Sequence, residues 1–430
     1  MTNSQLYNES TIIGCSLNRT IQYSDKVHIK SRYDRNGRRN DKLQSLTWSE
    51  LKSATFSLAK GLIALNVKPF DRVAVFGPNT PRWITTVFGI LAARATFLPI
   101  YPTSKPDDVW WYLHDSSAKI VFVHSQEHLD SVLKNHKRLK SLNRIVVMDP
   151  DVETDAKKGV ISFTDLITCG ETAQNSLDTV KKRLEEVCEE DVVAVFYTSG
   201  TTGRPKGVML TNKNFKSQLV VAKEFDFSPD DIWFAHLPLC HGFGFSADLL
   251  NCGYQGGTLY IVDSLEPEII RKSLHECRPT VMVSVPRMWE KLYLQIQSMV
   301  KQRPRFVQNL IGWALKVGRE SFISKMEGRP IPIGLKIKAR LAGRIFKKMR
   351  KKGGLDRLRV CVTGGGPIHP DLLYFFGGMG INIYQGYGLT ETSPVTHVCT
   401  PYANKIGCIG KPLPDTECRV DTSGELLIRG

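Results

Sequence analysis

The chain has 430 residues, of which 42% are hydrophobic and 23% are charged, so it can bury a sizeable core in several domains or one large subdivided domain. Its formal net charge of +16 favours anionic partners, which include nucleotides, coenzymes, membrane surfaces and nucleic acid. The ten cysteines contain no C-x-x-C pair, which argues against a disulfide framework or a zinc site and fits a reducing compartment.

The N-terminal sequence MTNSQLYNES has neither the basic nor the apolar region of a signal peptide. The most apolar stretch, residues 83–101, is interrupted by Arg94 and Pro99. It therefore predicts a buried helix followed by a strand, and not a membrane span. We expect a cytoplasmic protein.

Short apolar runs alternate with helical patterns in the first part of the chain. A helix is predicted after Thr47, where Glu50 completes a capping box. Its apolar face comprises Leu51, Ala54, Leu58 and Leu62. Strand patterns follow at 72–77, 95–101, 119–125 and 144–149, with helix-like segments between them. This alternation predicts parallel strands joined by crossover helices.

The alternation resumes after Asp191. Strands are predicted at 191–197, 231–239, 257–263, 279–286, 358–365 and 381–388, and CRVD and GELLIRG add two short strands. We expect the α/β fold class, with two layered, mostly parallel α/β subdomains over 1–190 and 191–395 and the start of a small β subdomain over 396–430. The last segment stops inside or just after a strand, so we also expect a truncated chain.

Residues 197–207, YTSGTTGRPKG, combine hydroxyls, glycines and a lysine directly after a strand pattern. The spacing does not match the G-x-x-x-x-G-K-[ST] of a P-loop. Gly200 and Gly203 allow close backbone approach, and the Lys206 ammonium can join hydroxyl and N–H groups around phosphate oxygens. The hydroxyls are those of Thr198, Ser199, Thr201 and Thr202. The pattern predicts a phosphate site; the alternative is an ordinary surface turn.

A second segment, QGYGLTETSP at 385–394, also follows a strand pattern. Gly386 and Gly388 leave a surface that a planar base can approach, and Tyr387 offers a ring for stacking. Thr390 can donate to a phosphate oxygen, and the carboxylate of Glu391 suits Mg²⁺. The alternative is that Thr390 and Glu391 simply begin a capped helix.

Two more segments place small residues at strand ends. VTGGGPIHP at 362–370 has three successive glycines, whose backbone can read an adenine edge, although a plain turn explains them as well. LPLCHGFGF at 237–245 sets His241 among glycines and phenylalanines, which suggests a cavity wall for an apolar substrate. The alternative for His241 is a structural histidine.

Together the four segments resemble the adenylate-forming superfamily of acyl-CoA synthetases, luciferases and nonribosomal peptide adenylation domains. YTSGTTGRPKG is very similar to the family's phosphate-binding signature, and GYGLTE to its second nucleotide motif. The resemblance extends from roughly Leu46 to Gly430. It implies the large N-terminal domain of an enzyme that forms an acyl-adenylate and pyrophosphate from ATP and a carboxylic acid.

The resemblance also implies a role for each matching position. It gives Mg²⁺ to Thr198 and Glu391, the α-phosphate to Thr390, and the boundary between adenylate and acyl pocket to His241. The triphosphate would lie against Thr198, Ser199, Gly200, Thr201, Thr202, Gly203 and Lys206. Adenine would lie among Gly364, Gly365, Gly366, Pro367, Gln385, Gly386, Tyr387 and Gly388. The catalytic set would be His241, Thr390, Glu391 and Lys206, and the acyl substrate would contact His241, Phe243 and Gly244.

Within the superfamily, SVPRMWEKLY at 284–293 and GWALKVGRE at 312–320 are similar to segments of long-chain fatty acyl-CoA synthetases. The resemblance thus implies a fatty acid–CoA ligase that uses ATP, Mg²⁺ and coenzyme A. The chain ends at the glycine of GELLIRG, before the family's ribose-binding aspartate, hinge, mobile C-terminal domain and adenylation lysine. We therefore expect nucleotide binding with weak or no overall ligase activity.

Several alternatives stay open. Within the same chemistry, the acyl group could pass to a carrier protein, or the acid could be an aryl acid. The chain could instead be a non-catalytic nucleotide- or acyl-binding protein. No zinc spacing, RNP-like strand or helix-turn-helix pattern supports nucleic-acid binding, so we expect no nucleic-acid partner. A homodimer is a further expectation that rests on the resemblance alone.

Residues 336–352, KIKARLAGRIFKKMRKK, carry nine Lys or Arg and no acidic residue. Ile337, Leu341, Ile345 and Met349 recur every four residues and predict an apolar helical stripe. One interpretation is a helix that lies on an anionic membrane at its inner face. The other is a solvated helix whose stripe packs on the core.

Overall fold

The computed structural model of the protein describes residues 7–198 and 203–430. The chain forms two compact units, one of Met1–Leu219 with Pro238–Asp263 and one of Val220–Leu237 with Ser264–Gly430. Ser199, Gly200, Thr201 and Thr202 of the first predicted motif lie outside the described residues. Among the described residues, no helix combines the length and the apolar character needed to cross a bilayer.

The main sheet of the first unit has seven strands in the order β7-β6-β5-β3-β4-β8-β9. All neighbours are parallel except β8 and β9, which form an antiparallel pair at one edge. The strands are β3 (Arg72–Phe76), β4 (Thr96–Ile100), β5 (Ile120–Val123), β6 (Arg144–Val147), β7 (Val160–Ser162), β8 (Val192–Thr198) and β9 (Lys206–Thr211). Strands β4 and β5 are buried along their whole length, as expected for parallel strands covered on both faces.

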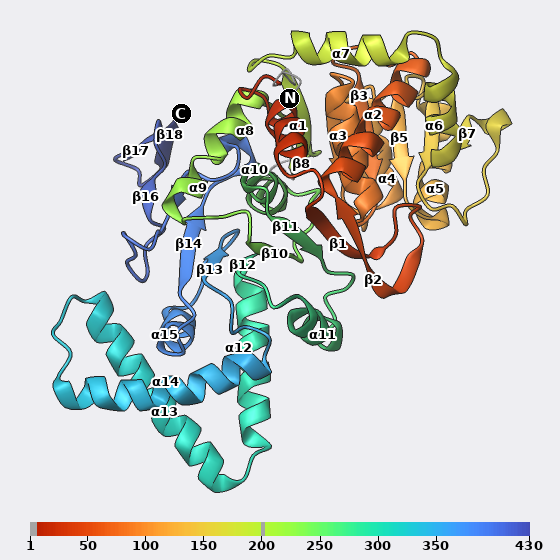
Figure 1. Ribbon diagram of the computed structural model, residues 1–430. Coiled ribbons are helices and arrows are strands. Elements are labelled where there is room, and N and C mark those ends of the chain that lie inside the picture. Colours follow the sequence, from red (N-terminus) through yellow and green to blue (C-terminus); the bar gives the residue numbers. More distant parts are fainter. Residues whose placement is uncertain (1–6, 199–202) are drawn as a thin grey trace. The chain divides into compact units, whose positions relative to one another are not determined.

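Helices cover this sheet on both faces, as Figure 1 shows in red to yellow. The helices of this part of the chain are α1 (Ile12–Gln22), α2 (Trp48–Ala64), α3 (Pro81–Ala92), α4 (Pro106–Asp115), α5 (Gln126–Leu133), α6 (Phe163–Thr172), α7 (Ser176–Glu186) and α8 (Asn212–Gln218), with 3₁₀ turns at His136–Arg138 and Ala156–Lys158. The capping box predicted for α2 is confirmed, since the Thr47 side chain accepts from the Glu50 N–H and Glu50 accepts from the Thr47 N–H. The predicted helix and strand within 83–101 are also confirmed as α3 and β4.

A smaller set of elements completes the first unit. Strands β1 (Val27–Tyr33), β2 (Arg39–Thr47) and β11 (Thr258–Ile261) lie in the order β11-β1-β2, with β1 parallel to β11 and antiparallel to β2. A π-helix (Gly244–Leu250) continues directly into α10 (Asn251–Gln255). The β1–β2 hairpin was not predicted from the sequence.

The second unit holds a mixed sheet in the order β16-β15-β14-β13-β12-β10. Strands β10, β12, β13 and β14 run parallel, and β15 and β16 are antiparallel additions at one edge. The strands are β10 (Ile232–Ala235), β12 (Val281–Ser284), β13 (Val360–Thr363), β14 (Ile383–Tyr387), β15 (His397–Val398) and β16 (Lys411–Pro412), and β17 (Glu417–Val420) pairs with β18 (Leu426–Arg429). The predicted α/β class with mostly parallel strands and a small β part is confirmed.

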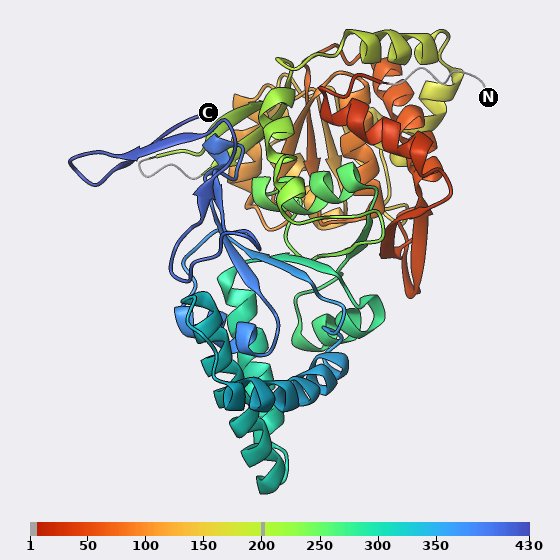
Figure 2. The same ribbon diagram turned by 60° about the vertical axis from the view of Figure 1, so that its left-hand side comes forward.

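The helices of the second unit are α9 (Val221–Glu224), α11 (Pro267–Cys277), α12 (Pro286–Lys301), α13 (Arg305–Met326), α14 (Ile333–Lys352) and α15 (Pro370–Gly378), with a 3₁₀ turn at Thr390–Thr392. Helices α13 and α14 cross each other, as Figures 1 and 2 both show. A small core joins them and comprises Ala314, Val317, Ala342, Phe346 and Met379.

The stripe predicted on α14 is only half correct. Ile345 and Met349 pack against the small core, whereas Ile337 and Leu341 are exposed. The physical reason is the period of the helix: a four-residue step overshoots a 3.6-residue turn, so a stripe with this spacing winds around the helix. The buried face instead follows Leu335, Ala339, Ala342 and Phe346.

The compact units are divided differently from the subdomain ranges expected from the sequence. Strands β8 and β9 follow residue 190, yet they extend the first sheet beside β4. Residues 238–263 also belong to the first unit.

Candidate functional site

The predicted phosphate loop connects the two strands of a β-hairpin. Strand β8 ends at Thr198, β9 begins at Lys206, and these two residues lie directly opposite each other in the antiparallel register. Thr198 is half-buried and Lys206 is exposed. Gly203 has φ of 125°, in the region that favours glycine. The hairpin thus sets a hydroxyl and an ammonium at the two ends of one short loop.

Helix α4 anchors the second arm of this loop. The indole Nε1 of Trp111 donates a hydrogen bond of 2.9 Å to the carbonyl oxygen of Pro205. The guanidinium of Arg204 lies 4.5 Å from the centre of the Trp111 ring. The position of Lys206 is therefore fixed by a residue that is far away in sequence, and sequence reasoning missed it.

Tyr197, the residue before Thr198, is also fixed by α4. Its hydroxyl donates to the Asp115 carboxylate at 2.6 Å, and its ring packs on Tyr112 with a centroid separation of 4.7 Å. Burial and the neighbouring Asp115 carboxylate raise the pKa of Tyr197, so it stays a neutral donor. Both arms of the hairpin are thus held by one helix.

His241 lies in the loop before the π-helix. The Phe243 N–H donates to its Nδ1 at 3.1 Å, so the neutral imidazole carries its hydrogen on Nε2. The side chain keeps an exposed surface, and partial burial lowers the pKa of the imidazole below its ordinary value. The ring of Tyr101 stands edge-on with a centroid 6.3 Å away. His241 therefore presents an N–H donor near neutral pH.

The other two acyl-site candidates, Phe243 and Gly244, are buried where the π-helix starts. Phe245 next to them packs against a cluster of aromatic rings formed by Phe97, Phe196 and Phe215. π-Helical turns are rare and often occur at functional sites. The apolar cavity wall around His241 therefore stays a prediction, and the aromatic cluster at Phe245 is consistent with it.

In the second unit, the two predicted adenine segments lie side by side. They follow β13 and β14, which are parallel neighbours with Thr363 opposite Gln385. Gly364 donates its N–H to the Ser284 carbonyl oxygen at 3.1 Å, and Gly365 has φ of 77°. Gly365, Gly366 and Pro367 are exposed beyond the strand end. This edge is where ligands sit in open parallel sheets.

Two buried polar atoms at this edge have no hydrogen-bond partner among the described residues. They are the Gln385 Oε1 and the Thr363 Oγ1. Buried polar atoms in folded proteins are nearly always paired, so an orphaned acceptor beside an exposed glycine loop points to a ligand. An exocyclic amino group of a base is a donor of the right kind for the Gln385 oxygen. The residues present therefore fit adenine.

Gly388 is required by a close backbone approach. A Cβ at this position would lie 1.6 Å from the Pro394 carbonyl oxygen, so no side chain can be accommodated without rebuilding the loop. Tyr387 is half-buried and packs edge-on against His397 at 6.1 Å. Its ring is thus held in place at the end of β14, as a stacking platform requires.

The alternative expected for Thr390 and Glu391 was the start of a capped helix. The structure has only a three-residue 3₁₀ turn there, over Thr390–Thr392. Thr392 closes this turn by accepting the Leu389 N–H at 2.9 Å. Glu391 is exposed and Thr390 is half-buried.

A carboxylate and a hydroxyl are suitable ligands for Mg²⁺, which usually keeps several waters and binds one or two carboxylates together with substrate phosphates. Within the described part of the chain, no group of three or more His, Cys, Asp or Glu forms a protein cage for a metal. The hydroxyl of Thr198 in the first unit and the carboxylate of Glu391 in the second unit are each of a chemical type that suits a cation arriving with the nucleotide.

A buried histidine supports the adenine edge and was also missed from the sequence. His236 Nδ1 donates to the Phe234 carbonyl oxygen at 3.1 Å, so its Nε2 accepts from the Ser284 hydroxyl at 3.0 Å. Burial lowers the pKa of His236 to about 4. Because the Ser284 carbonyl receives the Gly364 N–H, this neutral histidine helps to fix the glycine loop.

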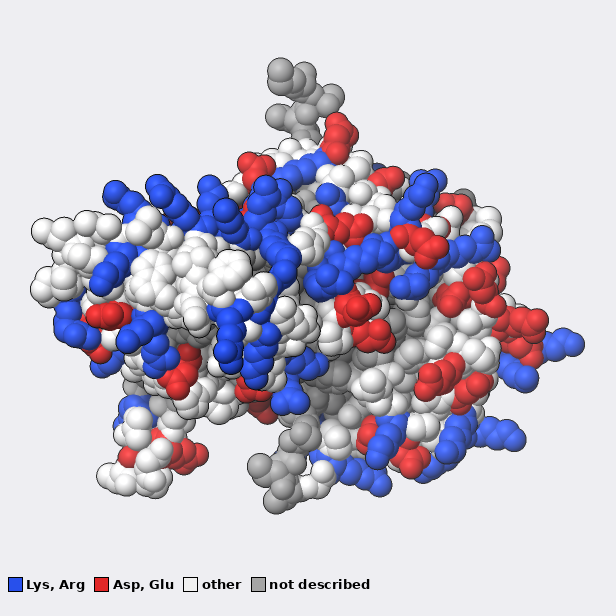
Figure 3. Space-filling model, turned by 90° about the horizontal axis from the view of Figure 1, so that it is seen from below, with Lys and Arg blue, Asp and Glu red and all other residues white. Residues whose placement is uncertain are grey.

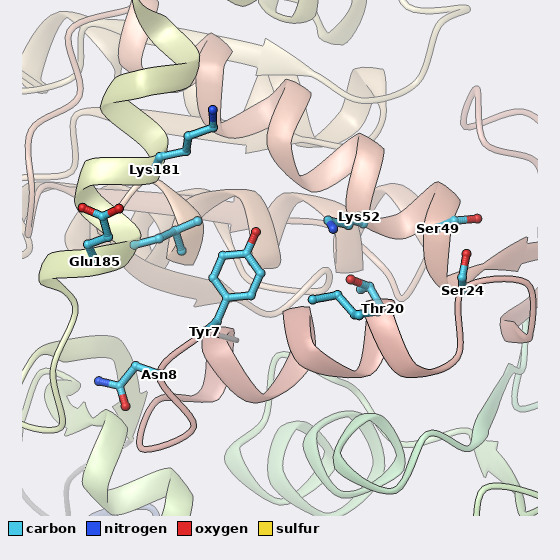
Figure 4. Close-up of a pocket in the computed structure, with 10 residues that line it drawn as sticks. Tyr7, Asn8, Thr20, Ser24, Ser49, Lys52, Lys181 and Glu185 are labelled. Atoms are coloured by element: carbon cyan, nitrogen blue, oxygen red, sulfur yellow. The ribbon is translucent and has the colours of Figure 1, made fainter. Parts of the chain in front are cut away.

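A cavity of about 940 Å³ lies elsewhere in the first unit, beside α1, α2 and α7. Figure 4 shows its lining, which includes Tyr7, Thr20, Lys52 and Lys181. None of the lining residues belongs to the four motifs. The motif residues themselves fall into two sets, one in each unit: Thr198, Gly203, Lys206, His241, Phe243 and Gly244, and then Gly364–Pro367, Gln385–Gly388, Thr390 and Glu391.

The curated proteins to which this chain is similar include long-chain-fatty-acid–CoA ligases. The chain is 27% identical over 427 residues to long-chain-fatty-acid–CoA ligase ACSBG2 of Xenopus laevis, covering 95% of this chain and 55% of that protein. It is 30% identical over 399 residues to long-chain-fatty-acid–CoA ligase FadD15 of Mycobacterium bovis, covering 90% and 62%. The chain thus spans 55% and 62% of the length of these two relatives.

Among solved structures, a long-chain-fatty-acid–CoA ligase (FadD1) from Archaeoglobus fulgidus matches with a TM-score of 0.71 and 20% identity, covering 99% of this chain and 75% of that one. ATP-bound MatB from Rhodopseudomonas palustris matches with a TM-score of 0.70 and 20% identity, covering 98% and 68%. These structures share the fold. The sequence profile of the AMP-binding enzymes matches residues 19–430, and the chain therefore belongs to the AMP-binding enzyme family.

Proposed function

We propose that this chain is the nucleotide- and acyl-binding part of a long-chain-fatty-acid–CoA ligase. One observation carries the proposal: the Gln385 acceptor is buried without a partner beside the exposed glycine loop of the neighbouring strand. The printed names of the curated relatives supply the fatty acid and coenzyme A. The phosphate hairpin, the adenine edge and the donor at His241 are the groups that such a reaction uses.

In the proposed reaction, a carboxylate oxygen of the fatty acid attacks the α-phosphorus of ATP. The bond to the bridging oxygen breaks, and pyrophosphate leaves with the electron pair. The thiolate of coenzyme A then attacks the acyl carbon, AMP leaves, and a thioester is formed. Both steps need an oriented nucleotide and stabilisation of charge on phosphate and carbonyl oxygens.

Different residues of the chain would bind the phosphates, the adenine, the acyl-adenylate oxygen and Mg²⁺. Thr198 and Lys206 at the hairpin ends would hold the β- and γ-phosphates, with Ser199–Thr202 between them, and Thr390 would donate to the α-phosphate. The glycine loop and Gln385 would bind adenine against Tyr387. The N–H on His241 Nε2 would donate to an oxygen of the acyl-adenylate. Mg²⁺ held by Thr198 and Glu391 would supply charge neutralisation for the phosphates.

The alternatives within the same chemistry are a carrier-protein acceptor and an aryl acid. A non-catalytic nucleotide- or acyl-binding protein is the alternative from another class. The proposal also includes a long-chain fatty acid as the substrate, coenzyme A as the acceptor of the acyl group, and a homodimeric state. A cytoplasmic location belongs to it as well.

The test is calorimetric titration with Mg·ATP of the wild type, Thr198→Ala and Glu391→Ala, repeated with ATP in the presence of EDTA. We expect both variants to weaken Mg·ATP binding by roughly tenfold to a hundredfold, since a hydrogen bond or ligand to a charged group contributes about 1.5–3 kcal/mol. In EDTA the Glu391→Ala deficit should vanish. The matched control is Glu268→Ala, which removes an exposed carboxylate of α11. Equal binding by all four proteins in Mg²⁺ would refute the assignment.

A further inference from the structure

The positive charge of this protein is concentrated in one stretch of helices. Residues 301–352 hold sixteen Lys or Arg and two Glu, a net charge of +14, so the rest of the chain nets only +2 of the total of +16. Figure 3 shows blue Lys and Arg side chains along the surface of α13 and α14, with white surface between them. A general requirement for solubility would spread such charge, so its concentration points to an anionic partner for this surface.

Most of the Lys and Arg side chains on α14 face solvent, although Lys351 interacts electrostatically with the Asp356 carboxylate. Eight of its nine Lys and Arg are exposed, and none of the nine forms an ion pair with a described residue. The ninth, Arg350, donates to the carbonyl oxygens of Met379 at 3.0 Å and Gly380 at 2.9 Å. Helix α14 therefore offers eight cationic side chains to an external partner.

The same helix exposes large apolar side chains on its outer face. Ile333, Ile337 and Leu341 are 77%, 59% and 45% exposed. Each lies one helical turn from the next, and Ile337 lies about 200° around the helix from Leu335 and Ala339 on the buried face. Further along, the outer face continues with Arg344 and Lys348 in place of apolar residues. The outer face is thus apolar in its first half and basic in its second half.

Helix α13 repeats this combination. Phe306, Leu310 and Trp313 are 73%, 48% and 37% exposed and follow each other at four- and three-residue steps on one face. The junction of α12 and α13 adds cations on both sides of Pro304: Lys301 ends α12, Arg303 lies in the turn, and Arg305 begins α13. Six large apolar side chains on two neighbouring helices are therefore exposed among cations, which a solvated surface alone does not explain.

We propose that the outer faces of α13 and α14, named here the basic hairpin surface, dock on an anionic lipid bilayer. Its apolar rows are Phe306, Leu310, Trp313 and Ile333, Ile337, Leu341. Lys and Arg side chains attract acidic headgroups, while the apolar rows enter the boundary of the acyl chains. Trp313 is a residue type that favours this interface.

A bilayer satisfies both features of the surface at once. A nucleic acid would use the cations but would leave the aliphatic row of Ile333, Ile337 and Leu341 in water. An acidic protein would need a groove of matching shape, whereas a fluid bilayer adapts to two separate rows. Docking is independent of the proposed ligase function, because no residue of the basic hairpin surface belongs to the four motifs.

The experiment measures partitioning of the full chain into sedimented vesicles of phosphatidylcholine, with and without phosphatidylglycerol. Wild type should bind the anionic vesicles and lose most of this binding at high salt. Lys347→Gln/Lys348→Gln/Lys351→Gln should lower the partition coefficient by roughly fivefold for each charge, the effect of about 1 kcal/mol per residue near a charged surface. Ile333→Ser/Ile337→Ser/Leu341→Ser should lower it by roughly tenfold or more at unchanged charge.

The matched control is Arg271→Gln/Lys272→Gln, which removes two exposed charges of α11, outside the basic hairpin surface. It should partition within twofold of wild type, and all variants should keep wild-type Mg·ATP affinity and thermal unfolding. Equal partitioning into neutral and anionic vesicles would overturn the proposal, as would a serine variant that binds like wild type. Binding to duplex RNA or DNA without vesicle binding would reassign the surface to nucleic acid and also overturn it.

Discussion

The indole N–H of Trp111 and the carbonyl oxygen of Pro205 are joined by a hydrogen bond of 2.9 Å across 94 positions of sequence. Pro205 directly precedes Lys206, the cation of the phosphate hairpin. The Arg204 guanidinium lies over the same indole. Helix α4 therefore determines where the ammonium group stands relative to Thr198, although it contributes no group to the phosphate itself.

Replacing Trp111 should weaken nucleotide binding without removing any phosphate ligand. We expect Trp111→Phe to lower Mg·ATP affinity by roughly fivefold, because it loses one hydrogen bond of about 1 kcal/mol and keeps a ring for Arg204. Trp111→Ala also loses the cation–π contact and should cost roughly twentyfold. Calorimetric titration measures both. Trp110→Phe is the control, since Trp110 Nε1 has no hydrogen-bond partner among the described residues; an equal loss in this control would contradict a specific role of Trp111.

Lys206 should act through its charge. Lys206→Ala should lower the affinity for Mg·ATP by roughly tenfold to a hundredfold and the affinity for adenosine much less, because a charge-assisted hydrogen bond to phosphate contributes about 1.5–3 kcal/mol. The comparison of the two ligands separates loss of a phosphate contact from general damage. Lys213→Ala, an exposed lysine of α8, serves as the charge control and should bind both ligands like wild type. A parallel loss for adenosine would speak against a phosphate role.

The buried, unpaired oxygen of Gln385 leads to a prediction for both the melting temperature of the free protein and its affinity for AMP. Gln385→Leu removes an unsatisfied oxygen, so the melting temperature of the free protein should stay equal or rise. The affinity for AMP should fall by roughly tenfold, since adenine loses its partner. Thermal unfolding with and without AMP measures both quantities in one experiment. A lower melting temperature with unchanged AMP stabilisation would show that Gln385 is structural.

The buried His236 gives a pH dependence of defined sign. Its folded-state pKa of about 4 is below the value of about 6.5 for a free histidine, because burial disfavours the charged form. As pH falls from about 6.5 towards 4, the unfolded state takes up a proton that the folded state does not, so stability is lost at about 1.4 kcal/mol per pH unit.

His236→Gln should remove this contribution from the free energy of unfolding. Urea titrations between pH 7 and pH 4 would measure it, and the slope of stability against pH should decrease by about one proton. His28 is the control, because burial also lowers its pKa to about 4 and it belongs to the other unit and to none of the four motifs. His28→Gln should change the slope equally but leave AMP affinity intact, whereas His236→Gln should weaken AMP binding. An unchanged slope in His236→Gln would contradict the assignment.

The strands were predictable where burial made them continuous. Strands β3, β5, β6, β12 and β13 lie where apolar runs predict them, because a parallel strand covered on both faces consists almost entirely of apolar residues. The β1–β2 hairpin and the edge strand β9 were missed, since their side chains alternate irregularly between solvent and core. Edge strands carry a weaker pattern for this reason.

Site residues could be predicted only where they belong to a short motif in the sequence. The glycine loop after β13 and the GYG segment after β14 were found as separate motifs, and the parallel register now places them side by side. Trp111 and His236 could not be found, because their roles depend on contacts with residues that are 94 and 48 positions away. The apolar stripe predicted on α14 was only half correct, because a spacing of four residues does not keep to one face of a helix.

The most direct test of the central claim is calorimetric titration of this chain with a non-hydrolysable palmitoyl-adenylate analogue, beside AMP and a benzoyl-adenylate analogue. The account predicts that the palmitoyl analogue binds on the order of a hundredfold tighter than AMP, because an intermediate analogue gathers the acyl and nucleotide contacts in one molecule. It also predicts weaker binding of the benzoyl analogue. A palmitoyl analogue that binds no tighter than AMP would contradict acyl-adenylate recognition, and tighter binding of the benzoyl analogue would assign an aryl acid instead.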